Sequence, residues 1–509
     1  MSESHQRRLK ILFLISLPVL GSLFWYFIKV FQFQGNQEEF SDGMLALQLS
    51  RGWLEGRPLL YDNFYGDHAR QHNYYFIPLT GLLTKFTGIY GLFLAYLGLF
   101  GVFFWQWFSG FKRFGTSLWT TNWLAVVFFV FGPMGYFIYL DYFGWHPEHY
   151  FLPLMALFAL NLAKRKYAMA AVWLLLTFLV KETSNILICS LLLFCSVVDF
   201  LLTDAGKPWF SYFLNKRNLI VASVCLLLFC LSMGWLSHLN GPQPSRLGTA
   251  ISRIQQSATP VRLITYISIY LVIGLIALIM GLFPFAIWLR SFKRRGIILG
   301  VLACGYSLLF VVYFFETLYY FPTIYMSVSY PPRIGGLWAL MLSAYVFISY
   351  RFSQAGIMPA AFSVTYIYTG LVFQLILSSF IVSHRFVIDS DSRSLGISAS
   401  KFINTRFGLN PYPDGNAHQL HELAKKLPEG SDVMVPNQYI SYFQNVYPGS
   451  WNYEEKPPML LRRPLLYVYE KSLIGKVSYY KFPQKGYRVI PNHQLLILAD
   501  SKWYNQRYK

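Results

Sequence analysis

Residues 11–32 read ILFLISLPVLGSLFWYFIKVFQ, a run of apolar side chains long enough to decide the class of fold. At a rise of about 1.5 Å per residue, a helix of this length crosses a hydrocarbon core of about 30 Å. Arg7, Arg8 and Lys10 precede the run as they would in a signal peptide, but no small-x-small cleavage motif follows it. We therefore interpret residues 11–32 as an uncleaved first transmembrane helix.

Apolar runs of similar length recur along the chain. Hydrophobic residues make up 55% of its 509 residues and charged residues only 13%, whereas about a quarter of the residues of a soluble domain are charged. The composition argues against a soluble globular protein and predicts a mainly α fold, a polytopic bundle of about eleven transmembrane helices. We expect the further spans at residues 88–109, 119–139, 149–163, 167–180, 184–203, 218–238, 265–289, 297–317, 335–350 and 359–382.

The distribution of basic residues predicts the orientation. The net charge is +20, but Lys and Arg are concentrated in short clusters in alternate loops, which is typical of cytoplasmic loops and not of a nucleic-acid surface. We therefore expect no nucleic-acid partner and a multi-pass membrane protein with a cytoplasmic N-terminus and an extracytoplasmic C-terminus. The five cysteines all fall in apolar spans, which supports neither a disulfide framework nor a cysteine zinc site.

The polar segments predict two domains. Residues 1–385 form the transmembrane domain, whose first outer loop, 33–87, contains two amphipathic segments, Gly43 to Leu54 and Ile77 to Phe86, expected to lie along the membrane. Residues 386–509 are expected to form a small extracytoplasmic α/β domain. Its predicted elements are a helix over 417–427 and strands over 465–469 and 494–498.

The first outer loop begins with an acidic stretch, NQEEFSDG at 36–43, just beyond the outer end of the first helix. A carboxylate here could act as a general base in a water-filled cavity at the lipid boundary, and Asp42 is the lead candidate. The alternative is that Asp42 caps the amphipathic helix that follows. One residue can do both.

Two further polar clusters are expected on the outer face, Tyr65 to His72 in the first outer loop and Asp141 to His149 at the top of the fourth predicted helix. In the string around Trp145 to His149, Pro147 suits the first position of a helix, which would place His146 and His149 on roughly one face as ligands for a metal or a phosphate. The alternative is interfacial histidines satisfied by their neighbours. No residue set is definite enough to predict a metal or another cofactor.

Charged residues also stand at the membrane boundary. Lys181 and Glu182 interrupt an apolar stretch, where ionisable groups usually face a cavity, and Lys181 offers a cation for a lipid phosphate. The alternative is a hairpin turn with its charges in interfacial water. Arg333, in an outer loop before the tenth predicted helix, is either a second ligand for an anion or a solvated charge.

These features resemble the GT-C superfamily of membrane glycosyltransferases, in which an acidic motif follows the first helix. The local strings are similar to those of the bacterial membrane family known as DUF2079, itself GT-C-like, over about residues 10–200. The strings are Asp42-Gly43 with Gln48 and Gly52, Gly66-Asp67-His68 with His72, Trp145-His146-Pro147-Glu148, and Val180-Lys181-Glu182.

The resemblance implies a glycosyltransferase of the bacterial inner membrane that moves a sugar from a polyprenyl-phosphate donor to a glycan, lipid or protein acceptor outside the cytoplasm. It maps the general base onto Asp42, with Glu39 as a substitute, although the acids here are not adjacent as in better-studied branches. The donor phosphate needs a cation such as Lys181 or Arg333. The resemblance also assigns substrate binding to His72, His146, Glu148, His149 and Glu182. The alternative function is a transporter or flippase of a lipid-linked or anionic substrate.

Overall fold

The computed structural model of the chain describes residues 3–35, 41–70, 72–111, 114, 116–132, 135, 138–139, 145–182, 184–203, 216–240, 331–356, 415–450, 460–474 and 485–507, with single positions between 252 and 268. The predicted spans at 265–289, 297–317 and 359–382 and the expected domain boundary near residue 385 lie outside the described residues. The chain divides into two compact units, the first made of residues 1–23, 97–139 and 148–394 and the second of residues 24–96, 140–147 and 395–509.

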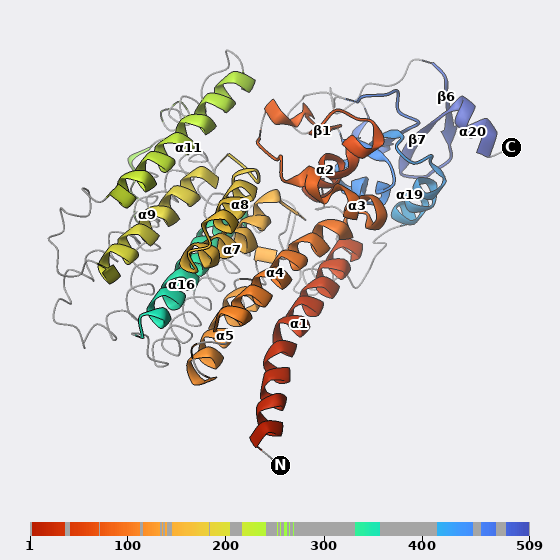
Figure 1. Ribbon diagram of the computed structural model, residues 1–509. Coiled ribbons are helices and arrows are strands. Elements are labelled where there is room, and N and C mark those ends of the chain that lie inside the picture. The colour runs from red at the N-terminus through yellow and green to blue at the C-terminus, as the bar shows by residue number, and fades with distance from the viewer. Residues whose placement is uncertain are drawn as a thin grey trace. The chain divides into compact units, whose positions relative to one another are not determined.

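The first unit is helical where it is described (Figure 1). Helices α1 and α4 each belong partly to both units. The helices are α1 (Glu3–Gly35), α4 (Tyr90–Phe111), α5 (Thr116–Phe131), α7 (Phe151–Ala163), α8 (Tyr167–Phe178), α9 (Ser184–Thr203), α11 (Lys216–Asn240) and α16 (Pro331–Gln354), with the short 3-10 helix η5 (Pro147–Tyr150) before α7.

Helix α7 forms the core of this unit. Nearly all of its residues are buried, and it packs against α16 and α8. Helix α16 also contacts α9 and α5. Tyr345 of α16 donates a hydrogen bond of 2.8 Å to the side-chain oxygen of Asn122 in α5, and Trp338 donates one of 2.8 Å to the carbonyl of Phe129. These bonds satisfy polar groups that burial would otherwise leave without water.

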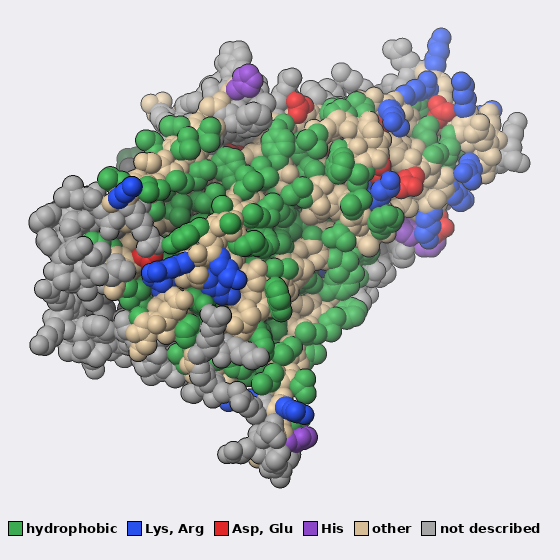
Figure 2. All heavy atoms as spheres, in the orientation of Figure 1, with side chains coloured by type: hydrophobic (Ala, Val, Ile, Leu, Met, Phe, Trp, Pro, Cys, Tyr) green, Lys and Arg blue, Asp and Glu red, His purple; other side chains and the backbone are tan. Residues whose placement is uncertain are grey.

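Apolar side chains are exposed on several of these helices. Two of the described helices contain a segment long and apolar enough to cross a bilayer, Arg8–Val30 in α1 and Tyr90–Gly110 in α4. Only 17% of the most apolar window of α1 is buried, so most of its large side chains face outward. Figure 2 shows hydrophobic side chains covering much of the helical surface on the face in view.

The second unit contains the first loop and the C-terminal region. The loop folds into α2 (Ser41–Arg51), η2 (Gly52–Glu55), β1 (Tyr61–Asp62), β2 (Gly66–Asp67), η3 (His68–Arg70), η4 (Ile77–Thr80) and α3 (Gly81–Thr87). Helices α2 and α3 pack closely at Gly81. A Cβ atom at this position would lie 2.6 Å from the carbonyl oxygen of Ser50, so a larger residue would not fit. The hydroxyl of Ser50 is within hydrogen-bond distance of Thr80 and Thr84, at 2.8 and 2.6 Å.

The described part of the C-terminal region of this unit is a five-stranded mixed sheet with two α-helices and two 3-10 helices. The strands lie in the order β4-β3-β5-β7-β6, and β3 is parallel to both β4 and β5, whereas β7 is antiparallel to β5 and β6. The elements are α19 (Gly415–Lys426), β3 (Asp432–Val435), η8 (Asn437–Phe443), β4 (Tyr447–Ser450), β5 (Leu466–Glu470), η9 (Lys471–Leu473), β6 (Tyr487–Ile490), β7 (Leu495–Asp500) and α20 (Ser501–Arg507).

Most predicted elements in the described part of the chain have a counterpart. Helix α9 has the predicted bounds, and α1, α4, α8, α11 and α16 cover or nearly cover their segments. The segment predicted at 149–163 begins as the 3-10 turn η5, because Pro147 starts that turn, and continues as α7. The two amphipathic segments of the first loop are each a short α-helix joined to a 3-10 helix.

Candidate functional site

Asp42 lies in the first turn of α2, one residue after the helix begins at Ser41. A carboxylate in this position is stabilised by the positive end of the helix dipole. The side chain is 37% exposed, so a substrate could reach it. A helix cap and a general base would both require an acid at this end of the helix. The structure places Asp42 within the first turn of α2 and not at the N-cap position that precedes the helix.

His146 is the partner of Asp42. Its Nε2 atom lies 3.3 Å from Oδ2 of Asp42, and its side chain is only 6% exposed. The preceding residue, Trp145, is completely buried, and its ring packs 5.4 Å from those of Phe93 and Tyr96 in α4. This anchoring fixes the backbone from which His146 reaches Asp42. Two residues that the sequence analysis singled out separately therefore meet in the second unit.

Glu148 and Lys181 form an ion pair in the first unit. Glu148 is buried at the second position of η5, and Lys181 is more accessible in the turn between α8 and α9. The backbone at Lys181 and Glu182 thus forms a turn between two helices, as the alternative interpretation predicted. That interpretation also placed the charges in interfacial water, whereas the side chain of Lys181 is paired with Glu148. Glu182 itself is buried.

The predicted common ligand of His146 and His149 has no support in these contacts. His149 places its Nε2 atom 2.8 Å from the carbonyl oxygen of Ile138, whereas His146 uses its Nε2 atom on Asp42. Each of these two Nε2 atoms therefore has a protein partner of its own. Within the described residues, no group of three or more His, Cys, Asp or Glu side chains gathers that could hold a metal ion.

The remaining predicted residues lie elsewhere. His72 is half-buried, and its ring stacks on Tyr74 with 5.0 Å between the centroids. Arg333 is in the first turn of α16, with only its backbone described. Glu39 falls outside the described residues.

Sequence reasoning missed several buried polar residues of the second unit, among them Asp62 and Lys29. Asp62 is completely buried, lies 2.9 Å from Nδ1 of His68, and accepts two backbone N–H groups. Lys29 of α1 is also completely buried, with its ammonium 5.7 Å from the centre of the Phe93 ring. The signal for Lys29 was present as a lone charge in the apolar run 11–32. Nothing in the local sequence distinguishes Asp62 from a turn residue.

Comparison with known proteins assigns no family. No family model matches the chain, and no curated protein matches it either. Among solved structures, the chain is similar to the crystal structure of ArnT from Cupriavidus metallidurans bound to undecaprenyl phosphate. The TM-score is 0.43 at 12% sequence identity, over 95% of this chain and 97% of that one. The resemblance to DUF2079 therefore stays a prediction.

Proposed function

We propose that the chain is a membrane glycosyltransferase that transfers a sugar from a polyprenyl-phosphate donor to an acceptor hydroxyl on the extracytoplasmic face. The observation that carries the proposal is the contact between Asp42 and His146. It joins an accessible carboxylate to a buried imidazole, an arrangement that suits a positioned general base. The proposal also draws on the motif resemblance set out above.

A membrane location is supported by the surface of α1. A core helix of a soluble protein is mostly buried, but the apolar window of α1 is 17% buried and presents large side chains such as Phe13, Leu20 and Phe27 outward. Helix α3 likewise exposes Leu82 and Phe86, and the preceding η4 exposes Leu79. Exposed apolar faces of this size are expected to contact lipid, and a lipid-linked donor would then be delivered in the plane of the membrane.

In the proposed reaction, the oxygen of the acceptor hydroxyl attacks the anomeric carbon of the sugar. The bond from that carbon to the phosphate oxygen breaks, the lipid phosphate leaves with the bonding electrons, and Asp42 takes the proton of the hydroxyl. His146 holds the carboxylate in place and, when protonated, balances its charge. Asp42 is the catalytic residue in this proposal and His146 a positioning residue.

Lys181 is proposed to bind the phosphate of the donor. An ammonium group stabilises the charge that develops on a leaving phosphate. Its ion pair with the buried Glu148 would hold the Lys181 side chain in one orientation and reduce the entropy lost when the phosphate binds. We place Glu148 as a positioning residue on this basis.

The test uses the purified chain in lipid nanodiscs with a panel of radiolabelled polyprenyl-phosphate sugars. We expect transfer or release of sugar from one donor, lost in Asp42→Asn. The matched control is Glu429→Gln, because Glu429 is an exposed acid of the same unit, and it should leave turnover unchanged. No turnover with any donor by a folded protein, or turnover that is indifferent to Asp42, would overturn the proposal. Transport of a labelled donor without sugar transfer would favour the flippase.

A further inference from the structure

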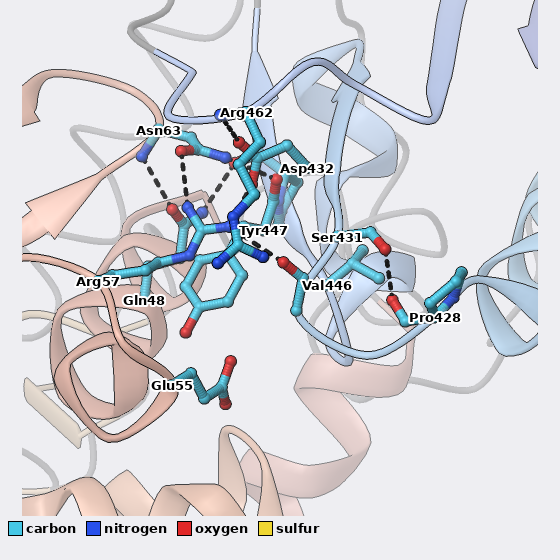
Figure 3. A network of polar contacts seen from close by, with 12 residues as sticks. Gln48, Glu55, Arg57, Asn63, Pro428, Ser431, Asp432, Val446, Tyr447 and Arg462 are labelled. Carbon is cyan, nitrogen blue, oxygen red and sulfur yellow. Dashed lines mark hydrogen bonds and ion pairs between the residues drawn. The ribbon is translucent and has the colours of Figure 1, made fainter. Parts of the chain in front are cut away.

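Side chains of the first loop, which contains Asp42, form hydrogen bonds and an ion pair with the C-terminal sheet (Figure 3). Arg57 follows η2, and its guanidinium lies over the ring of Tyr447, with 3.3 Å between its carbon Cζ and the ring centre. The same guanidinium forms an ion pair with Asp432 and donates a hydrogen bond of 3.1 Å to the carbonyl of Gly430. Arg57 and Asp432 are both buried, so the pair is shielded from water and from salt.

Asp432 and Tyr447 both contact Arg57 from the same side of the sheet. They stand opposite each other in the parallel pair of β3 and β4, which places their side chains on the same side of the sheet. The second carboxylate oxygen of Asp432 accepts the backbone N–H of Arg462 at 2.6 Å. The aspartate is therefore also held by the backbone of the segment that precedes β5 while it binds the loop.

Helix α2 itself is hydrogen-bonded to β4 and to the residue just before it. Gln48 donates to the carbonyl of Pro448 at 2.7 Å, and Arg51 donates to the carbonyl of Val446 at 3.0 Å. Asn63 completes the set, because its amide donates to the carbonyl of Tyr447 at 2.8 Å while its backbone N–H donates to Gln48 at 2.9 Å. Backbone carbonyls on and just before an edge strand thus accept side chains from the loop, where they would otherwise need another strand or water.

These contacts act on the helix that positions the proposed base. Gln48 and Arg51 lie in the second half of α2, and Asp42 lies in its first turn. A helix of this length moves as a rigid body, so fixing its second half limits the displacement of its first turn. A shift of about 1 Å at a reacting group reduces the rate by about 100-fold.

We propose that Arg57 is a positioning residue. Through its contacts with Asp432 and Tyr447, the C-terminal sheet holds α2 in place, so that Asp42 stays in contact with His146. The inference rests on the proposed function for its kinetic part alone. It assigns to the C-terminal region the role of a clamp on the first loop.

The first experiment measures the clamp without sugar transfer. Hydrogen–deuterium exchange of the amides of α2 is compared in nanodiscs for the wild type, Arg57→Ala, Arg57→Lys and Arg488→Ala. Arg488 is the matched control because it is an exposed arginine of the same sheet whose guanidinium lies 6.0 Å from the ring of Tyr504. We expect faster exchange in Arg57→Ala, partial recovery in Arg57→Lys, which keeps the charge but not the planar guanidinium, and no change in Arg488→Ala.

The second experiment measures catalysis by the same variants. We expect Arg57→Ala to lower kcat by about 10- to 100-fold with little change in the KM for the donor, and Arg57→Lys to recover part of the loss. Should Arg57→Ala fail to fold, Gln48→Ala removes one tie of the same helix and should raise the exchange of α2 in the same way. Unchanged exchange of α2 in the folded variants would overturn the clamp. If exchange rises in the variants and the wild type transfers no sugar, the clamp stands and the proposed function fails alone.

Discussion

His146 places its Nε2 atom 3.3 Å from Oδ2 of Asp42, so that a nearly buried imidazole supports a carboxylate that solvent can reach. Replacing His146 with Ala should lower kcat about 10- to 100-fold with the donor KM nearly unchanged, because the carboxylate loses the group that orients it. His146→Gln, which retains a hydrogen-bonding side chain, should recover part of the rate. Steady-state kinetics on the labelled donor measures both, with His418→Ala on the exposed side of α19 as control. Wild-type rates in His146→Ala would contradict the assigned role.

Lys181 offers a test of phosphate binding. Lys181→Met should raise the KM for the donor by about 10-fold or more, because the phosphate loses its cation and Glu148 is left as a buried charge without this lysine. Lys181→Arg keeps the charge and should bind the donor more nearly as the wild type does. The control is Lys166→Met, since Lys166 is exposed before α8. Equal KM values for Lys181→Met and the wild type would remove the residue from the site.

Asp199 and Arg351 form a buried ion pair of 2.7 Å between α9 and α16. Asp199→Ala should destabilise the protein by about 3–5 kcal/mol, because it leaves the guanidinium buried without that counter-charge. The double variant Asp199→Leu with Arg351→Met should recover most of this loss, since no charge then remains to be compensated. Thermal unfolding in detergent measures the difference. A double variant no more stable than Asp199→Ala would show that the pair is not the cause.

Tyr447 gives a prediction for alkaline pH. Burial, followed by the nearby carboxylate of Glu55, raises the pKa of its hydroxyl above the usual value of 10.0, so the folded protein favours the neutral phenol. The resulting stability is fully present below pH about 10 and is lost as the pH rises further toward the folded pKa, because the unfolded chain ionises first. Tyr447→Phe keeps the ring beneath Arg57 and should flatten this loss. Unfolding scans between pH about 9 and about 11 measure it, and parallel curves for the two proteins would contradict the assignment.

Neighbouring residues of α1 should report its lipid face. Phe13 is 62% exposed and Leu14 only 2%, so a spin label at Phe13→Cys should collide readily with oxygen, which dissolves in lipid, and rarely with a polar nickel complex. A label at Leu14→Cys should be protected from both. The labels are introduced after the five native cysteines have been replaced. Ready access of the nickel complex to position 13 would contradict a lipid-facing α1.

The sequence by itself determined where most helices of the described part lie, because an apolar run of about twenty residues has few alternatives to a helix when water is excluded. Helix α9 begins and ends at its predicted residues, and turn residues and alternation likewise located β5 and β7. The same reasoning found Asp42, His146, Glu148 and Lys181 as chemical candidates, since charged and imidazole groups next to apolar runs need a reason to be there.

Only the tertiary structure decided which of these groups meet. The pairing of Asp42 with His146, and of Arg57 with Asp432, joins segments far apart in the chain, whereas local spacing relates only residues within about one helical turn of each other. Whether Lys29 and Asp62 are buried also depends on which elements pack over them. Local sequence sets the helices and strands, but the side-chain contacts between them are set by packing of distant segments, which no single stretch of residues encodes.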